Sequence, residues 1–108
     1  MPAEDTRDSI RQGLVNRLRH GPGHAPAEQR ARAFDNAEPH QPLGVLLDKV
    51  ATKSAHVTDA DFAAAMETGF TDDQLFELVI CTAVGQATRQ YEAGLAALAE
   101  ATADAEST

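Results

Sequence analysis

Few residues in this chain have the types and spacing that acid/base chemistry requires. Glu77 lies one helical turn before the single cysteine, Cys81, in an apolar run. A carboxylate there is either a buried acid with a raised pKa or a group whose charge reaches solvent at the edge of a helix pair, and we favour the second. His56 is the other candidate for moving a proton. Glu77 and His56 are therefore the candidate catalytic residues, although no spacing rule links them.

Arg89 and Tyr91 are the candidate ligand-binding residues. Arg89 is the only lysine or arginine after Lys53, in a strongly acidic part of the chain. A lone arginine in such a setting is either an ion-pair partner, across a subunit interface, or an anchor for the carboxylate of a ligand. We favour the ion pair, and a small carboxylic acid is the ligand that the alternative implies.

Neither a metal site nor a cofactor is predicted. His20 and His24 would place two ligands on one helix face, but two glycines and a proline between them break the helix. Cys81 is the only cysteine and cannot form an intramolecular disulfide. Its apolar surroundings predict a buried structural thiol.

Charge restricts the possible partners. The chain has 108 residues and a formal net charge of −8, which argues against nucleic-acid binding and against adhesion to an anionic membrane. Residues 1–34 nevertheless hold six arginines and four acids, whereas residues 35–108 hold three basic and thirteen acidic residues. The simplest interpretation is a basic arm that lies on an acidic body, in the same chain or a neighbour; a partner-binding tail is the alternative.

Apolar stretches are short throughout the chain. None approaches the roughly 20 residues that span a bilayer, and the N-terminus has no run that resembles a signal peptide. We therefore expect a cytoplasmic location.

Hydrophobic periodicity predicts an all-α fold. We expect one helix over residues 5–19, with a stripe of Ile10, Leu14, Val15 and Leu18, a short one over 26–36, and a core helix from Leu43 to about His56. The chain then divides into a basic helical arm and linker (1–41), a helical core (42–103) and a disordered tail (104–108).

An antiparallel helix pair over about 59–68 and 72–101 is the best-specified local structure. Thr58 can cap the first helix, and Asp61 can reach back to the Thr58 amide. Gly69 supplies the left-handed residue that ends this helix. Thr71 and Gln74 then repeat the capping box.

The second helix of the pair should be unusually long. From Asp72 nothing stops it until about Ala101, which predicts a length of roughly 45 Å. Its apolar residues cover most of its circumference between Leu75 and Ala87, and Gly85 in this stretch indicates a close helix crossing. A helix buried on several sides and longer than its own domain predicts a homo-oligomer, either a dimer or a trimer-based assembly.

Residues 47–98 resemble the carboxymuconolactone decarboxylase and alkylhydroperoxidase D superfamily, whose core is an all-helical, oligomeric unit. Redox members of that superfamily carry C-x-x-C-x-x-x-H, followed by x-x-x-A-x-x-x-G and a capped helix. Here the same pattern places Ala65 and Gly69 at the scaffold positions, followed by F-T-D-D-Q-L-F-E. The chemical positions hold Ser54, Val57 and Asp61 in place of the two cysteines and the histidine.

This substitution bears on activity. Peroxide reduction needs a low-pKa thiolate and a second, resolving thiol, which Ser54 and Val57 cannot supply. The sequence therefore argues against thiol peroxidase activity and predicts a non-redox, non-catalytic oligomer that binds a small molecule or partner at its subunit cleft. The alternative is a lyase or isomerase of a small carboxylic acid, in which Arg89 holds the carboxylate and Glu77 or His56 moves the proton.

Overall fold

The computed structural model describes residues 3–107, and within them every regular element is helical. The elements are α1 (Ala3–His20), α2 (Ala27–Phe34), α3 (Leu43–Thr52), the 3-10 turn η1 (Ser54–His56), α4 (Asp59–Glu67) and α5 (Asp72–Ser107). The predicted all-α class is confirmed. No helix in this part of the chain is both long enough and apolar enough to cross a membrane.

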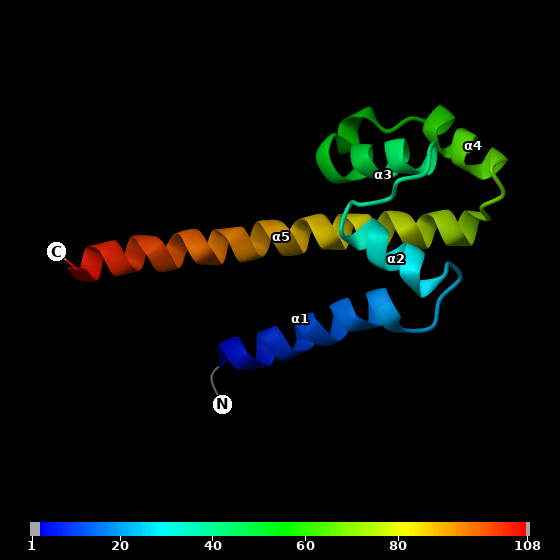
Figure 1. Ribbon diagram of the computed structural model, residues 1–108. Helices are drawn as coiled ribbons and strands as arrows, with labels where there is room; N and C mark the ends of the chain where they lie inside the picture. Colours follow the sequence, from blue (N-terminus) through cyan, green and yellow to red (C-terminus); the bar gives the residue numbers. More distant parts are fainter. Residues whose placement is uncertain (1–2, 108) are drawn as a thin grey trace.

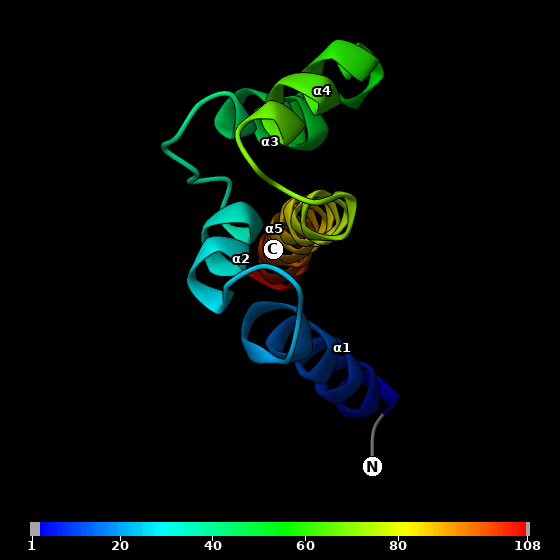
Figure 2. The ribbon, with the colours of Figure 1, turned by 90° about the vertical axis from the view of Figure 1, so that its right-hand side faces the viewer.

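The other helices are arranged around the first half of α5. Viewed along α5, the pair α3 and α4 lies on one side of it, α2 on a second side and α1 on a third (Figure 2). The C-terminal part of α5 extends past all the other elements (Figure 1). The radius of gyration is 16.9 Å, whereas a compact chain of this length has about 13 Å.

Both predicted capping boxes are present. The Thr58 hydroxyl accepts a hydrogen bond from the Asp61 amide, and the Asp61 carboxylate accepts one from the Thr58 amide at 2.9 Å. The Thr71 amide donates to Gln74 Oε1 at 3.0 Å, and the Gln74 amide donates to the Thr71 hydroxyl. Gly69 between the two helices has a φ of +112°, which a residue with a side chain rarely adopts. These local contacts end α4 and start α5 where the sequence predicts.

The core lies between α5 and the helices packed on it. Its largest fully buried side chains are Leu43, Leu46, Leu47, Leu75, Leu78, Thr82 and Cys81. The predicted close crossing at Gly85 is also found, because a Cβ atom at this position would collide with the backbone of Phe34, the last residue of α2. Glycine is therefore what allows α2 to lie directly on α5.

Three features differ from the sequence prediction. The helix expected from Leu43 to about His56 ends at Thr52, and residues 54–56 form the separate 3-10 turn η1. Val15 and Leu18 of the predicted α1 stripe are half-buried, and Leu18 packs against the core. Ile10 and Leu14 are exposed instead, and Arg11 is half-buried against α5, so the inward face of α1 includes only half of the predicted stripe. α5 continues to Ser107, past the end expected near Ala101, and includes residues 104–107 of the predicted disordered tail. Residues 1, 2 and 108 lie outside the described part of the chain.

Candidate functional site

Glu77 on α5 is held by the loop that leads into α2. Its carboxylate accepts hydrogen bonds from the backbone amides of His24 at 2.8 Å and Ala25 at 3.1 Å, and it lies 3.4 Å from Arg30 Nε. Only 19% of the side chain is exposed. Neither of the two predicted environments describes it fully, since the carboxylate is largely buried and yet strongly paired.

These contacts set the protonation state of Glu77. Burial acts to raise the pKa of the carboxyl, but the two backbone hydrogen bonds and the charge of Arg30 outweigh burial, so the pKa lies below its ordinary value. The direction is opposite to the raised pKa of a buried acid. Glu77 therefore stays ionised near neutral pH and fixes the loop to α5, which leaves it poorly suited to donate or take up a proton in catalysis.

Arg30 forms the other half of this cluster, and the sequence analysis did not single it out. Arg30 is only 4% exposed, and its guanidinium donates hydrogen bonds to the carbonyls of Leu18, Gly21 and Ala25. The Leu18 and Gly21 carbonyls lie at the C-terminal end of α1, where a positive charge is favourable. Arg30 precedes the buried Ala33 and Phe34 by three and four residues, and that helical spacing is the signal that could have placed it on the inner face of α2.

His56 lies apart from this cluster. It is exposed at the end of η1, and within residues 3–107 no hydrogen bond or ion pair links it to Glu77. The structure therefore does not bring together the two residues that the sequence suggests for proton transfer.

Cys81 has the environment that the sequence predicts for a structural thiol. It is fully buried, and its Sγ lies 3.8 Å from the carbonyl oxygen of Leu18. Burial raises the pKa of the thiol, an effect that Arg30 only partly opposes. A thiol of this kind is a poor nucleophile.

Arg89 makes contacts that neither sequence alternative describes. It donates to the Phe34 carbonyl at 2.7 Å and to Gln86 Oε1 at 3.0 Å. Because Phe34 is the last residue of α2, Arg89 caps that helix at the crossing beside Gly85. One face of the side chain also lines a cavity.

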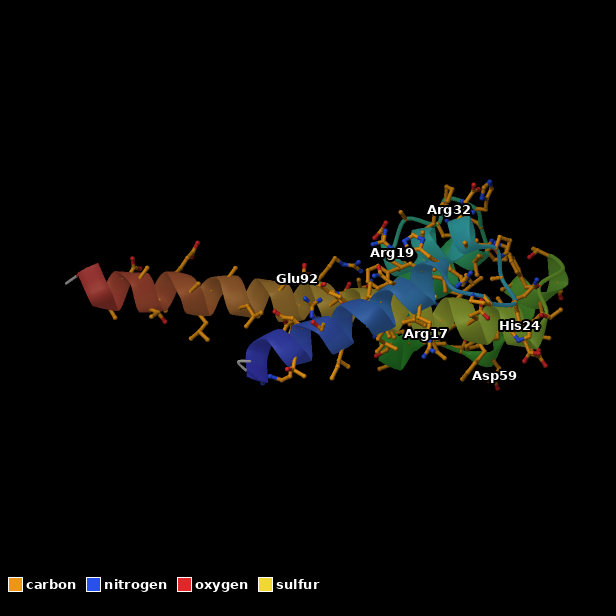
Figure 3. All side chains as sticks on the ribbon, turned by 90° about the horizontal axis from the view of Figure 1, so that it is seen from below. Arg17, Arg19, His24, Arg32, Asp59 and Glu92 are labelled. Atoms are coloured by element: carbon orange, nitrogen blue, oxygen red, sulfur yellow. The ribbon has the colours of Figure 1, made fainter. Side chains whose placement is uncertain are left out.

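The cavity, which we call the arginine cavity, has a volume of about 410 Å³ and lies where α1, α2 and α5 meet. Its principal lining residues are Arg11, Val15 and Arg19 from α1, Phe34 and Asp35 at the end of α2, and Arg89 from α5. The side chain of Arg19 points to the opposite side of α1 from that of Arg17 (Figure 3). Arg11, Val15 and Arg19 have the spacing i, i+4, i+8, which is the sequence signal that could have predicted this face.

Tyr91 lines a neighbouring groove rather than the arginine cavity. This α1–α5 groove has a volume of about 430 Å³ and is lined by Arg7, Asp8, Tyr91, Leu95 and Leu98. The guanidinium of Arg11 lies 5.5 Å from the centre of the Tyr91 ring, at cation–π distance. Two predicted ligand-binding residues, Arg89 and Tyr91, therefore line different hollows on the same side of α5.

The predicted contact between basic arm and acidic body is found within the chain. Arg11 Nη1 lies 3.6 Å from Glu92, and Arg19 Nη2 lies 3.8 Å from Asp35. Within residues 3–107, no three His, Cys, Asp or Glu side chains lie close enough together to hold a metal ion.

Comparison with known protein families, with characterised proteins and with solved structures finds no match to this chain.

Proposed function

We propose that this chain is a non-redox binding protein that assembles with copies of itself through the outer half of α5, residues 90–107, and binds a small molecule beside that interface. The observation that carries the proposal is the exposure of this segment. Every residue from Gln90 to Ala105 is exposed, and Tyr91, Leu95 and Leu98 are 45%, 46% and 63% exposed. These three large apolar side chains at helical spacing line a groove beside α1 and remain about half exposed, which makes a surface suited to another helix.

The same segment lacks the packing that most protein helices have. Most helices in proteins are stabilised by packing of one apolar face, and every residue of this segment from 90 to 105 is exposed. The segment is also rich in small residues, among them Ala93, Gly94, Ala96 and Ala97, which permit close approach of two helices. The α5 helix of a second copy would bury the apolar stripe of both chains at once.

Charge favours an antiparallel arrangement of the two copies. If two α5 helices cross near Leu95, the end of each helix returns along residues 80–90 of the other. The end of α5 is acidic and includes Glu100, whereas α1 carries Arg7 beside Tyr91 and Leu95. A two-fold axis repeats this contact between unlike charges on both sides of the interface.

A second apolar groove fits a copy of the chain less well. It has a volume of about 540 Å³ between α4 and α5 and is lined by Phe62, Met66, Leu75, Phe76, Val79 and two aspartates, Asp72 and Asp73. Because the chain carries a net charge of −8, an acidic groove would repel most of a neighbour's surface.

The non-redox part of the proposal is supported by Cys81, the only thiol of the chain. Burial and a raised pKa keep it from acting as the attacking thiolate. The capped helices around Gly69 support our proposal of a divergent member of the alkylhydroperoxidase D-like superfamily, which retains the scaffold without its thiols.

Light scattering tests the assembly. We expect wild-type protein at micromolar concentration to have a mass that is a multiple of that of one chain. Leu95→Glu should reduce this to the mass of one chain, because it places a carboxylate in the middle of the apolar stripe.

Val45→Glu is the matched control. Val45 on α3 is 46% exposed, the same fraction as Leu95, but it lies away from α5's outer half. It should leave the mass unchanged. A monomeric wild-type protein, or equal dissociation by both variants, would contradict the proposal.

A further inference from the structure

The arginine cavity concentrates positive charge in a protein that otherwise carries little of it. Three of the nine lysines and arginines of the chain line this one hollow, although the chain has a net charge of −8. They come from two helices that are far apart in sequence. Asp35 and Glu92 also line the cavity, so its formal charge is only slightly positive. This balance suits a small anion better than a polyanion.

Two of these arginines have unsatisfied hydrogen-bond donors. The Nε atoms of Arg11 and Arg19 are shielded from solvent and have no hydrogen-bond partner among the described residues. Their carboxylate neighbours lie 3.6–4.0 Å away, beyond the usual 2.7–3.2 Å of a hydrogen bond. Each guanidinium therefore has an ion-pair partner nearby but retains one buried N–H without a hydrogen-bond partner among the described residues.

Arg30 shows how a purely structural arginine is accommodated in the same molecule. All three of its guanidinium nitrogens donate to backbone carbonyls. Arg11 and Arg19 are instead held over aromatic rings, those of Tyr91 and Phe34, at 5.5 Å and 5.0 Å. Stacking fixes the plane of a guanidinium and leaves its edge free to donate to a planar or tetrahedral oxyanion.

We infer that the arginine cavity binds a small oxyanion, a carboxylate or a phosphate, through the guanidinium groups of Arg11 and Arg19, with Arg89 adding charge. The inference rests on the proposed binding function and names the class of ligand. Gln12, Asn16 and Thr88 also line the cavity and provide neutral donors and acceptors for the rest of the molecule. A volume of about 410 Å³ lies in the usual range for small-molecule sites, about 300–1,000 Å³.

The first experiment uses the full chain and two probes, inorganic phosphate and a series of small mono- and dicarboxylates. Calorimetric titration gives the affinity and stoichiometry of each probe. In parallel, ¹⁵N nuclear magnetic resonance follows the Nε–H signals of the arginines. We expect one oxyanion to bind with one site per chain, and to shift the Arg11 and Arg19 signals more than the Arg17 signal. The probe that binds more tightly identifies the ligand as a phosphate or a carboxylate.

Variants then locate the site. Arg19→Gln removes a guanidinium from the cavity and should weaken binding about 10- to 100-fold, as expected for a charge-assisted hydrogen bond. Arg17→Gln makes the same change of charge two residues away on the opposite side of α1, and should leave the affinity within about twofold (Figure 3). Should Arg19→Gln fail to fold, the wild-type resonance shifts still decide the question.

Three results would overturn the inference: no binding of any probe at millimolar concentration, equal weakening by both variants, or resonance shifts that do not include Arg11 and Arg19. Light scattering on the same samples separates this outcome from failure of the proposed assembly. A monomer that binds the oxyanion refutes the assembly alone, and an oligomer that binds no oxyanion refutes the cavity alone.

Discussion

The two halves of α5 have similar helix-forming residues but very different surroundings. In the inner half, residues 72–89, Leu75, Leu78 and Cys81 are buried under the neighbouring helices. In the outer half, every residue from 90 to 105 is exposed. Each half contains a glycine: Gly85 lies against Phe34, whereas a Cβ at Gly94 would meet nothing within 4 Å.

The contrast shows that composition alone does not assign a role to a residue on this helix. Leucines of the inner half are buried within a single chain, whereas Leu95 and Leu98 of the outer half stay 46% and 63% exposed and lose more surface only when a second surface covers them. Equivalent substitutions in the two halves should therefore have unequal effects on a single chain.

The largest difference is expected for leucine. Leu78→Ala removes a fully buried side chain and should lower the free energy of unfolding by about 2–5 kcal/mol. Leu98→Ala should cost less than about 0.5 kcal/mol at concentrations where the chain is monomeric. Urea denaturation followed by circular dichroism measures both. Equal losses at low concentration would mean that the outer half packs on its own chain.

Replacing a glycine should give the next largest difference in stability between the two halves. The substitution should destabilise the inner half and stabilise the outer half. Gly85→Ala places a methyl group against the backbone of Phe34, and overpacking of this kind costs about 1–3 kcal/mol. Gly94→Ala should increase stability by about 0.5–1 kcal/mol, because alanine is the better helix former in an open position. Thermal unfolding of both variants under identical conditions makes the comparison. Stabilisation by Gly85→Ala would contradict the close crossing.

Replacing a glutamate should give the smallest difference in stability between the two halves. Glu77→Gln leaves the amides of the loop before α2 with a weaker acceptor and Arg30 without its counter-charge, so we expect a loss of about 1–2 kcal/mol at neutral pH. Glu100→Gln, in the exposed outer half, should change stability by less than about 0.5 kcal/mol. Urea denaturation at pH 7 measures both losses, and equal losses would contradict the pairing of Glu77 with the loop.

Acid should remove the Glu77 contribution. The pKa of Glu77 is lowered by folding from its ordinary value of 4.5, so its stabilisation is complete above about pH 4.5 and is lost as the pH falls through the pKa of the folded state. The difference in the free energy of unfolding between wild type and Glu77→Gln should therefore be constant above pH 4.5 and should become smaller below it. Denaturant unfolding across this range measures the difference, and a difference that widened in acid would refute the assigned pairing.

Local features of the fold could be predicted from the sequence because adjacent residues determine them. The capping boxes at Thr58 and Thr71 and the left-handed Gly69 each depend on contacts within a few residues. The crossing at Gly85 could also be predicted, because a glycine in the middle of an apolar helix weakens that helix and is favoured where another backbone comes close.

The sites could not be predicted to the same extent, because they depend on how distant segments dock. Glu77 meets amides more than fifty residues away, and no periodicity in α5 identifies them. The orientation of α1 also depended on docking. The sequence pointed to Ile10, Leu14, Val15 and Leu18 as the inward face, but of these only Val15 and Leu18 are half-buried. Arg11 and Arg19 take the other inward positions, near their counter-charges Glu92 and Asp35.

Arg30 also determines whether the N-terminal arm is a separable unit. Its guanidinium joins the last turn of α1, the turn at Gly21 and the entry to α2, and it lies beside Glu77 on α5. Removal of α1 together with Gly21 would leave this buried cation without two of its three carbonyl acceptors, a condition that destabilises a fold strongly. The sequence suggests that α1 is a separate arm, but its last carbonyls are needed to satisfy the buried charge of Arg30. The chain should therefore fold and unfold as one cooperative unit.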